Sequence, residues 1–158
     1  MTLSIAFPLQ IVKALISDLR AILELRHLAF QSEAILLNDY TIQPLTQTLN
    51  EVKEEYAKGL ILKAISDAET IIGSVWAYEE NNTAYIGKLV VHPSFRNQGL
   101  GAKLLAAIEE SCPARRYELH TTDRSLNNLH LYQKLGYQKF RTEPWPQGYS
   151  FVYLEKFS

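Results

Sequence analysis

The stretch that decides the fold is Val90–Leu105, which reads VVHPSFRNQGLGAKLL. It predicts an apolar strand end, a basic turn with two glycines, and then an amphipathic helix. Glycine lets the backbone approach a ligand closely, and the free N–H groups at the start of a helix point at an anion. The turn 96–101 is therefore a candidate phosphate site, with Arg96 beside it. The alternative is a plain strand-to-helix turn in which the glycines only ease the bend.

The spacing of the two glycines excludes two well-known phosphate loops. A Walker A loop needs G-x-x-x-x-G-K-[ST], and a dinucleotide-binding turn needs G-x-G-x-x-G. Neither pattern is present in Arg96–Gly101.

The composition predicts one ordinary globular domain over residues 1–158. Hydrophobic residues make up 47% and charged residues 21%, with a formal net charge of −1. This near-neutral balance gives no general attraction to nucleic acid or to a membrane surface. Cys112 is the one cysteine, so neither an intrachain disulfide nor a cysteine zinc cluster forms. Without a signal-like or membrane-spanning segment, we expect a cytoplasmic protein.

The hydrophobic periodicity along the rest of the chain predicts a mixed α/β domain in the order βααβββαβαββ. The three central strands follow one another through short turns, which is typical of an antiparallel meander. The predicted strands are 9–15, 60–66, 70–80, 83–92, 117–121, 137–142 and 149–157, and the predicted helices are 18–33, 44–55, 99–112 and 125–135.

The helix 125–135 carries a polar stripe. Ser125, Asn128 and Tyr132 are spaced i, i+3, i+7 and share one face. A phenol in that position is suited to donating a proton to a leaving group bound across the helix. A solvated helix face is the alternative.

Other ionisable residues form no clear site. His27, His92, His120 and His130 are scattered without the paired spacing of metal ligands, so we predict no metal. The adjacent pair Glu79-Glu80 ends a strand before the Asn81-Asn82 turn, where acids are either solvated or available as a base.

Two motifs together resemble the GNAT superfamily, the Gcn5-related N-acetyltransferases. Arg96–Gly101 matches that family's [Q/R]-x-x-G-x-[G/A] motif, and Leu131–Tyr137 matches its L-Y-x-K-x-G-[FY] signature. The resemblance implies a single-domain GNAT fold, α/β (α+β), with a mixed central sheet of about seven strands. It also implies a V-shaped split of that sheet between the strands 83–92 and 117–121.

The resemblance further implies acetyl-CoA as co-substrate, with Tyr132 as the general acid that protonates the departing thiolate. Ser125 stands where many members carry asparagine, and no base transfers by motif. We therefore expect a water chain to lead to Glu79, Glu80 or a backbone carbonyl, and a backbone N–H near Val91 to polarise the acetyl carbonyl. The residues implied to bind the cofactor are Leu89, Val90, Val91, Arg96, Asn97, Gln98, Gly99, Leu100, Gly101, Ala102, Ser125, Asn128 and Tyr132.

The acceptor is left open by the sequence, between a small-molecule amine and a protein amino group. One alternative function is a catalytically inactive CoA-binding sensor or structural module, and another is a binder of a different nucleotide phosphate. A homodimer through an exposed edge of Tyr149–Phe157 is also predicted.

Overall fold

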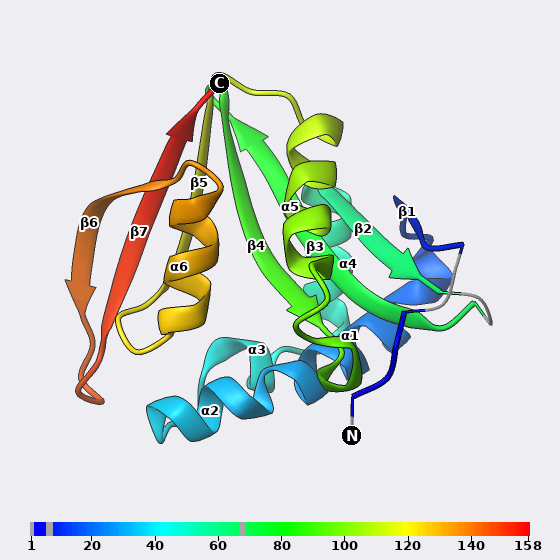
Figure 1. The fold of residues 1–158 in the computed structure, drawn as a ribbon, viewed down its shortest axis with the longest axis horizontal. Coiled ribbons are helices and arrows are strands. Elements are labelled where there is room, and N and C mark those ends of the chain that lie inside the picture. The colour runs from blue at the N-terminus through cyan, green and yellow to red at the C-terminus, as the bar shows by residue number, and fades with distance from the viewer. Residues whose placement is uncertain (1, 6–7, 67–68) are drawn as a thin grey trace.

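A seven-stranded mixed sheet in the order β1-β2-β3-β4-β5-β7-β6 forms the centre of the computed structural model, which describes residues 2–5, 8–66 and 69–158 (Figure 1). The sheet confirms the predicted fold class. The strands are β1 Gln10–Lys13, β2 Leu60–Ile65, β3 Ile71–Glu80, β4 Thr83–Val91, β5 Arg116–Thr122, β6 Gln138–Pro144 and β7 Ser150–Phe157. The predicted turn at 67–69 lies partly outside the described residues.

The helices lie on both faces of this sheet. In Figure 1, α5 and α6 lie in front of it, with α1 and α4 behind and α2 below its open end. The helical elements are η1 Ile16–Asp18, α1 Leu19–Ala29, α2 Gln31–Leu37, α3 Gln43–Thr46, α4 Leu49–Lys58, η2 Pro93–Phe95, α5 Leu100–Ser111 and α6 Leu126–Lys134.

Both helices predicted before the meander are divided in the structure. The first breaks at Phe30 into α1 and α2, and Asn38 ends α2 with a left-handed φ of 51°. The second divides into α3 and α4 because Thr48 starts a new helix with its own capping box to Glu51. The sequence analysis missed this capping signal, and with it the boundary.

The sheet splits between β4 and β5, as predicted. These parallel strands pair only over Thr83–Tyr85 and Arg116–Glu118, and then diverge. Figure 1 shows them meeting near the C-terminus and opening toward α2. The second half of β4 therefore has one backbone edge without a strand partner, which leaves its N–H and C=O groups available to a ligand.

A β-bulge lies in β4 at the point where the strands diverge. Trp76 pairs with Gly87 and Ser74 with Val90, so β4 has one extra residue, and Lys88 takes a left-handed φ of 53°. Because of the extra residue, the side chain of Lys88 reaches Glu55 of α4, behind the sheet.

Two apolar layers hold the helices on the sheet. The helix predicted at 99–112 buries its apolar stripe, with Leu100, Leu104 and Ile108 at 0–1% exposure in the larger cluster. On the opposite face, Ile22 and Val52 pack with Ile61 in a smaller cluster. This packing fixes α5, and with it the glycine-rich turn, against β4.

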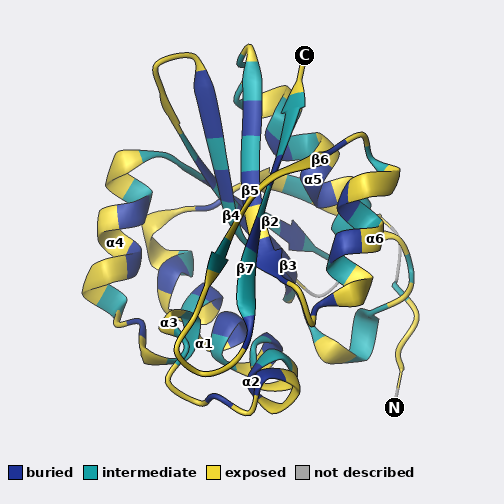
Figure 2. Cartoon of the chain, turned by 90° about the vertical axis from the view of Figure 1, so that its left-hand side faces the viewer, coloured by how far each residue is buried: buried dark blue, intermediate teal, exposed yellow. Residues whose placement is uncertain are grey.

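The predicted edge at Tyr149–Phe157 is wrong, since β7 lies between β5 and β6 with partners on both sides. The β6 strand forms that edge, and Figure 2 shows it exposed along most of its length. The sequence does not show which strand forms the edge, because the last strand, β7, lies between β5 and β6 rather than beyond β6. Dimerisation itself stays a prediction.

Candidate active site

The glycine-rich turn leads directly into the N-terminus of α5. Asn97 and Gly99 adopt left-handed φ values of 62° and 80°, and Gly99 is the N-cap residue without a capping side chain. A Cβ built on Gly99 would meet no atom within 4 Å, so open space lies beside the first turn. The amides of this turn and the positive end of the helix suit a phosphate there.

A cleft of about 740 Å³ extends from this turn along the split in the sheet. It is bounded by the α1–α2 junction, the end of β4, the N-terminus of α5 and the N-terminus of α6. The residues that line it are Ala29, Phe30, Ser32, Glu33, Leu36, Leu89, Val90, Val91, Phe95, Arg96, Asn97, Gly99, Leu100, Gly101, Ala102, Arg124, Ser125, Leu126, Asn127, Asn128 and Leu131. Both sequence motifs thus contribute to one cleft.

Of the residues predicted to bind a cofactor, all except Gln98 and Tyr132 line this cleft. The side chain of Gln98 instead accepts a hydrogen bond from the amide of Ile5, at 2.9 Å. It therefore fixes the N-terminal segment against the loop.

Arg96 lies in the predicted loop but faces the α1–α2 junction. Its Nη2 donates to the carbonyl oxygen of Ala29 at 2.9 Å, and its Nη1 donates to Ser32 Oγ at 3.1 Å. The guanidinium thus supports one wall of the cleft as well as adding positive charge to it.

Ser125 and Asn128 lie on the opposite wall, at the start of α6. Ser125 is buried; its hydroxyl donates to a carboxylate oxygen of Glu33 and lies 2.7 Å from the hydroxyl of Thr122. Asn128 Nδ2 donates to Thr121 Oγ1 at 3.3 Å. The polar stripe predicted on this helix is therefore not merely a solvated face.

Tyr132 lies below this wall and is 6% exposed. Its ring packs against Tyr137, with the ring centroids 6.2 Å apart. Burial, and after it the negative charge of Glu33, raise the pKa of Tyr132 far above its usual value. No hydrogen bond joins its hydroxyl to another described residue, and the raised pKa keeps the phenol protonated.

Glu79 and Glu80 lie away from the cleft. They pair with Ala84 and Thr83 at the closed end of the β3–β4 hairpin, and neither lines the cleft. At the rise of an extended strand, Ala84 and Val90 are roughly 20 Å apart. The structure therefore places the two predicted bases at the end of the hairpin, away from the cleft.

A carboxylate that the sequence analysis missed does line the cleft. Glu33 is the third residue of α2, and its contact with Ser125 spans 92 positions of the chain. No local pattern marks it, because a glutamate near a helix end is ordinary. Only the fold brings it to the site.

A buried charged network lies behind the sheet, and it too was missed. Arg26 is fully buried and donates from Nη1 to Glu55 Oε1 at 2.7 Å and to Gln47 Oε1 at 3.0 Å. Lys88 Nζ reaches Glu55 Oε2 at 3.2 Å, and burial lowers the pKa of Lys88. This network ties the bulge of β4 to α1, α3 and α4. None of its members lines the cleft.

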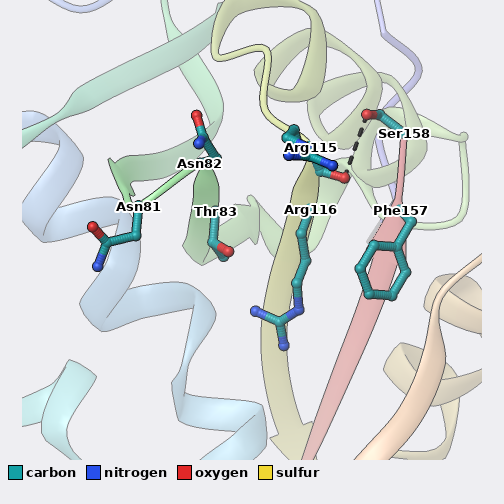
Figure 3. Close-up of a pocket in the computed structure, with 7 residues that line it drawn as sticks. All are labelled: Asn81, Asn82, Thr83, Arg115, Arg116, Phe157 and Ser158. Atoms are coloured by element: carbon teal, nitrogen blue, oxygen red, sulfur yellow. Dashed lines mark hydrogen bonds between the residues drawn. The ribbon is translucent and has the colours of Figure 1, made fainter.

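A second hollow of about 420 Å³ lies at the closed end of the sheet (Figure 3). Arg116 enters it, but its guanidinium is paired with Glu118 at 2.9 Å and Glu155 at 2.8 Å. No predicted site residue lines it. Its charge is already balanced, so we assign it no role in the chemistry.

The remaining residues singled out from the sequence have ordinary surroundings. His92 Nδ1 accepts from the amide of Ser94 at 3.0 Å, which is a structural role. Cys112 caps the C-terminus of α5, at the end far from the turn.

Among the described residues, no three His, Cys, Asp or Glu side chains gather as metal ligands do. None of the helices in this part of the chain has the length and apolar character of a membrane span.

Comparison with known families agrees with this architecture. The model of the acetyltransferase (GNAT) family matches residues 19–137, and the chain belongs to that family. The resemblance found in the sequence is thereby confirmed.

The individual proteins compared with this chain match it either over part of its length or at low sequence identity. Mycothiol acetyltransferase from Thermobispora bispora is 34% identical over 92 residues, which are 58% of this chain but only 28% of that protein. The ribosomal-protein-S18-alanine N-acetyltransferase from Escherichia coli has a TM-score of 0.77 at 14% identity, covering 94% of this chain and 93% of the other. PaiA N-acetyltransferase from Thermoplasma acidophilum, solved with coenzyme A, has a TM-score of 0.72 at 19% identity, covering 96% and 100%. These structures share the fold.

Proposed function

We propose that this protein is an acetyl-CoA-dependent N-acetyltransferase that acts on a primary amine by direct attack on the thioester. The observation that carries the proposal is that one cleft is lined by both family motifs and by the unpaired edge of β4. Family membership and the related structure with coenzyme A support it.

The residues around the cleft fit the two ends of acetyl-CoA. The first-turn amides of α5, with open space beside Gly99, suit the diphosphate. The free edge of β4 at Leu89–Val91 suits the amide groups of pantetheine, which pair with it much as an added strand does. Acetyl-CoA supplies the acetyl group as an activated thioester.

The chain's own groups then provide acid catalysis and charge stabilisation. An amide of β4 near Val91 polarises the acetyl carbonyl as negative charge develops on its oxygen. Tyr132, kept protonated by its burial, donates its proton to the departing sulfur. The reaction runs through a ternary complex without an acyl-enzyme.

The acceptor class follows only coarsely from the relatives. The names of the compared proteins include a mycothiol acetyltransferase, a ribosomal-protein-S18-alanine N-acetyltransferase and a spermidine N-acetyltransferase. We therefore propose a small-molecule amine or a protein amino group, and a cytoplasmic location.

The second candidate is a CoA-binding sensor or structural module without activity. The distance of Glu79 and Glu80 from the cleft favours it, because the bases predicted from the sequence do not reach the reaction.

One experiment separates the two candidates. Acetyl-CoA binding is measured by calorimetry, and transfer is measured as free CoA over a panel of alkylamines, amino acids and peptide N-termini. Binding with transfer to any amine supports the enzyme. Binding without transfer supports the sensor, and absence of binding contradicts both.

A further inference from the structure

Glu33 occupies a particular position across the mouth of the cleft. It lies on α2, which crosses below the open end of the sheet (Figure 1), and it accepts a hydrogen bond from Ser125 on α6. Among the described residues that line the cleft, Glu33 is the only one with a carboxylate. A single negative charge is therefore held where both motifs meet.

Among the described residues, no lysine or arginine lies within ion-pair distance of the Glu33 carboxylate, although Arg96 and Arg124 line the same cleft. The contact of this carboxylate with Ser125 involves only Oε1. No described residue donates a hydrogen bond to Oε2. Since a carboxylate has several acceptor positions, Glu33 retains capacity for a donor from outside the chain.

Glu33 also lies close to the proposed general acid. Its charge adds to burial in raising the pKa of Tyr132, and it acts in the same sense on Tyr149 after the larger effects of burial and Asp39. An electrostatic effect of this kind needs proximity in a weakly screened environment. Glu33 lines the cleft, and its charge reaches Tyr132, which lies behind the residues that line it.

We propose that Glu33 binds the ammonium group of the acceptor and removes its proton, with Ser125 as the residue that positions it. This inference rests on the proposed function. The carboxylate lines the cleft, reaches Ser125 on the opposite wall and acts electrostatically on the group that would protonate sulfur. Glu79 and Glu80 end β3 at the closed end of the hairpin and do not line the cleft.

The protons balance across the reaction. The ammonium gives one proton to Glu33, which passes it to water, and the neutral nitrogen then forms a bond to the acetyl carbon. The attached nitrogen loses a second proton as the carbon–sulfur bond breaks. Tyr132 gives a proton to the sulfur and recovers one from solvent. The net products are the amide, CoA as the thiol, and one released proton.

The test compares two acceptors of the same shape. One is the best alkylamine from the panel, which is an ammonium at neutral pH because its pKa is roughly 10.4. The other is its aminooxy analogue, in which oxygen replaces the adjacent methylene and the nitrogen is neutral at that pH. Only the first acceptor needs a base before it attacks.

We expect Glu33→Gln to lower kcat for the alkylamine by about 100-fold, within the range of general-base contributions. For the aminooxy analogue we expect a change of less than about threefold, because no ammonium proton has to be removed. The acetyl-CoA dissociation constant stays within about twofold. Glu24→Gln, on an exposed position of α1, is the matched control and leaves both rates unchanged.

Three results would overturn the inference. These are an unchanged kcat in Glu33→Gln, an equal loss for both acceptors, which indicates a structural role, and a rise in KM alone, which indicates cation binding without proton transfer. If the wild-type protein transfers acetyl to no amine at all, the proposed function itself fails. The two failures are therefore distinguishable.

Discussion

Arg96 Nη2 donates a hydrogen bond to the carbonyl oxygen of Ala29 at 2.9 Å, joining the glycine-rich loop to the last residue of α1. An arginine in this position satisfies a carbonyl that the helix leaves free and offsets the negative end of its dipole. The same guanidinium reaches Ser32, beyond the break at Phe30. The loop and the α1–α2 junction are thus held as one unit around the cleft.

Removal of this guanidinium should weaken both the fold and the cleft. We expect Arg96→Ala to lower the free energy of unfolding by about 1 kcal/mol, since it deletes two partly exposed hydrogen bonds. We expect acetyl-CoA affinity to fall about tenfold. Calorimetry and urea unfolding check these changes, with Arg20→Ala, on the exposed face of α1, as the control for lost charge. Unchanged affinity in Arg96→Ala would remove Arg96 from the site.

Removal of the hydroxyl of Tyr132, the proposed proton donor, should lower activity without lowering stability. Tyr132→Phe should lower kcat by about 10- to 100-fold while acetyl-CoA affinity stays the same. Stability should change little, because no hydrogen bond joins this hydroxyl to another described residue.

The matched control for that prediction is Tyr117→Phe. The Tyr117 hydroxyl donates to the carbonyl oxygen of Glu109 and accepts from the amide of Ala114. Its loss should therefore lower stability by about 1 kcal/mol and leave kcat unchanged. Equal kcat in Tyr132→Phe and the wild type would rule out Tyr132 as the acid.

Because open space lies beside Gly99, we expect substitutions at this position, but not at Gly136, to weaken acetyl-CoA binding. Gly99→Ala and Gly136→Ala both force a side chain into a left-handed backbone, with φ values of 80° and 99°, at a cost of about 1–2 kcal/mol each. Only Gly99 borders the cleft, so only that variant should bind acetyl-CoA more weakly. Gly99→Glu should abolish binding in calorimetry, because it adds a negative charge where we propose that the diphosphate binds. Normal binding in Gly99→Glu contradicts the phosphate site.

The fold could be predicted closely because its signals are local. Strand and helix positions followed from periodicity, and Gly99 and Gly136 marked a helix start and a helix end. Two short motifs at fixed places then selected one family, including the split of the sheet. The helix boundary near Phe30 was missed because no capping side chain marks that break. The boundary at Thr48 was missed although its capping box with Glu51 is a local signal in the sequence.

The site could be predicted only on the side that the motifs cover. The walls of the cleft formed by α5 and α6 each come from a short contiguous stretch of sequence, which a motif can identify. The contact of Glu33 with Ser125 joins residues 92 positions apart, and no local pattern identifies it. Glu79 and Glu80 were candidate bases in the sequence because they end a strand before the Asn81-Asn82 turn. The structure places them away from the cleft, because the nine residues of β4 separate the hairpin end from the part of β4 that lines the cleft. Their action through water stays a prediction.

The buried network behind the sheet predicts a large loss of stability. Glu55→Ala leaves Arg26, which is fully buried, without its carboxylate, and also releases Lys88. Breaking a buried ion pair in this way typically costs about 3–5 kcal/mol. Glu54→Ala, at the neighbouring exposed position, should change stability by less than about 0.5 kcal/mol. Urea midpoints measure both, and similar midpoints for the two variants contradict the role of the network.

The raised pKa of Tyr149 predicts how the free energy of unfolding responds to alkaline pH. Burial first, and then the hydrogen bond that its hydroxyl donates to Asp39 at 2.9 Å, raise the pKa of Tyr149 from 10.0 to about 12. The folded state therefore holds this proton more tightly than the unfolded state does. The stability that this provides is complete below pH 10 and is lost as pH rises through about 12.

Tyr149→Phe isolates that effect, because every other group titrates in both proteins. We expect the stability difference between wild type and Tyr149→Phe to be constant up to pH 10 and to shrink between pH 10 and 12. Urea midpoints measured across that range check the change. A difference that stays constant to pH 12 would show that the Tyr149 phenol titrates as it does in the unfolded chain, and that its hydrogen bond to Asp39 does not raise its pKa.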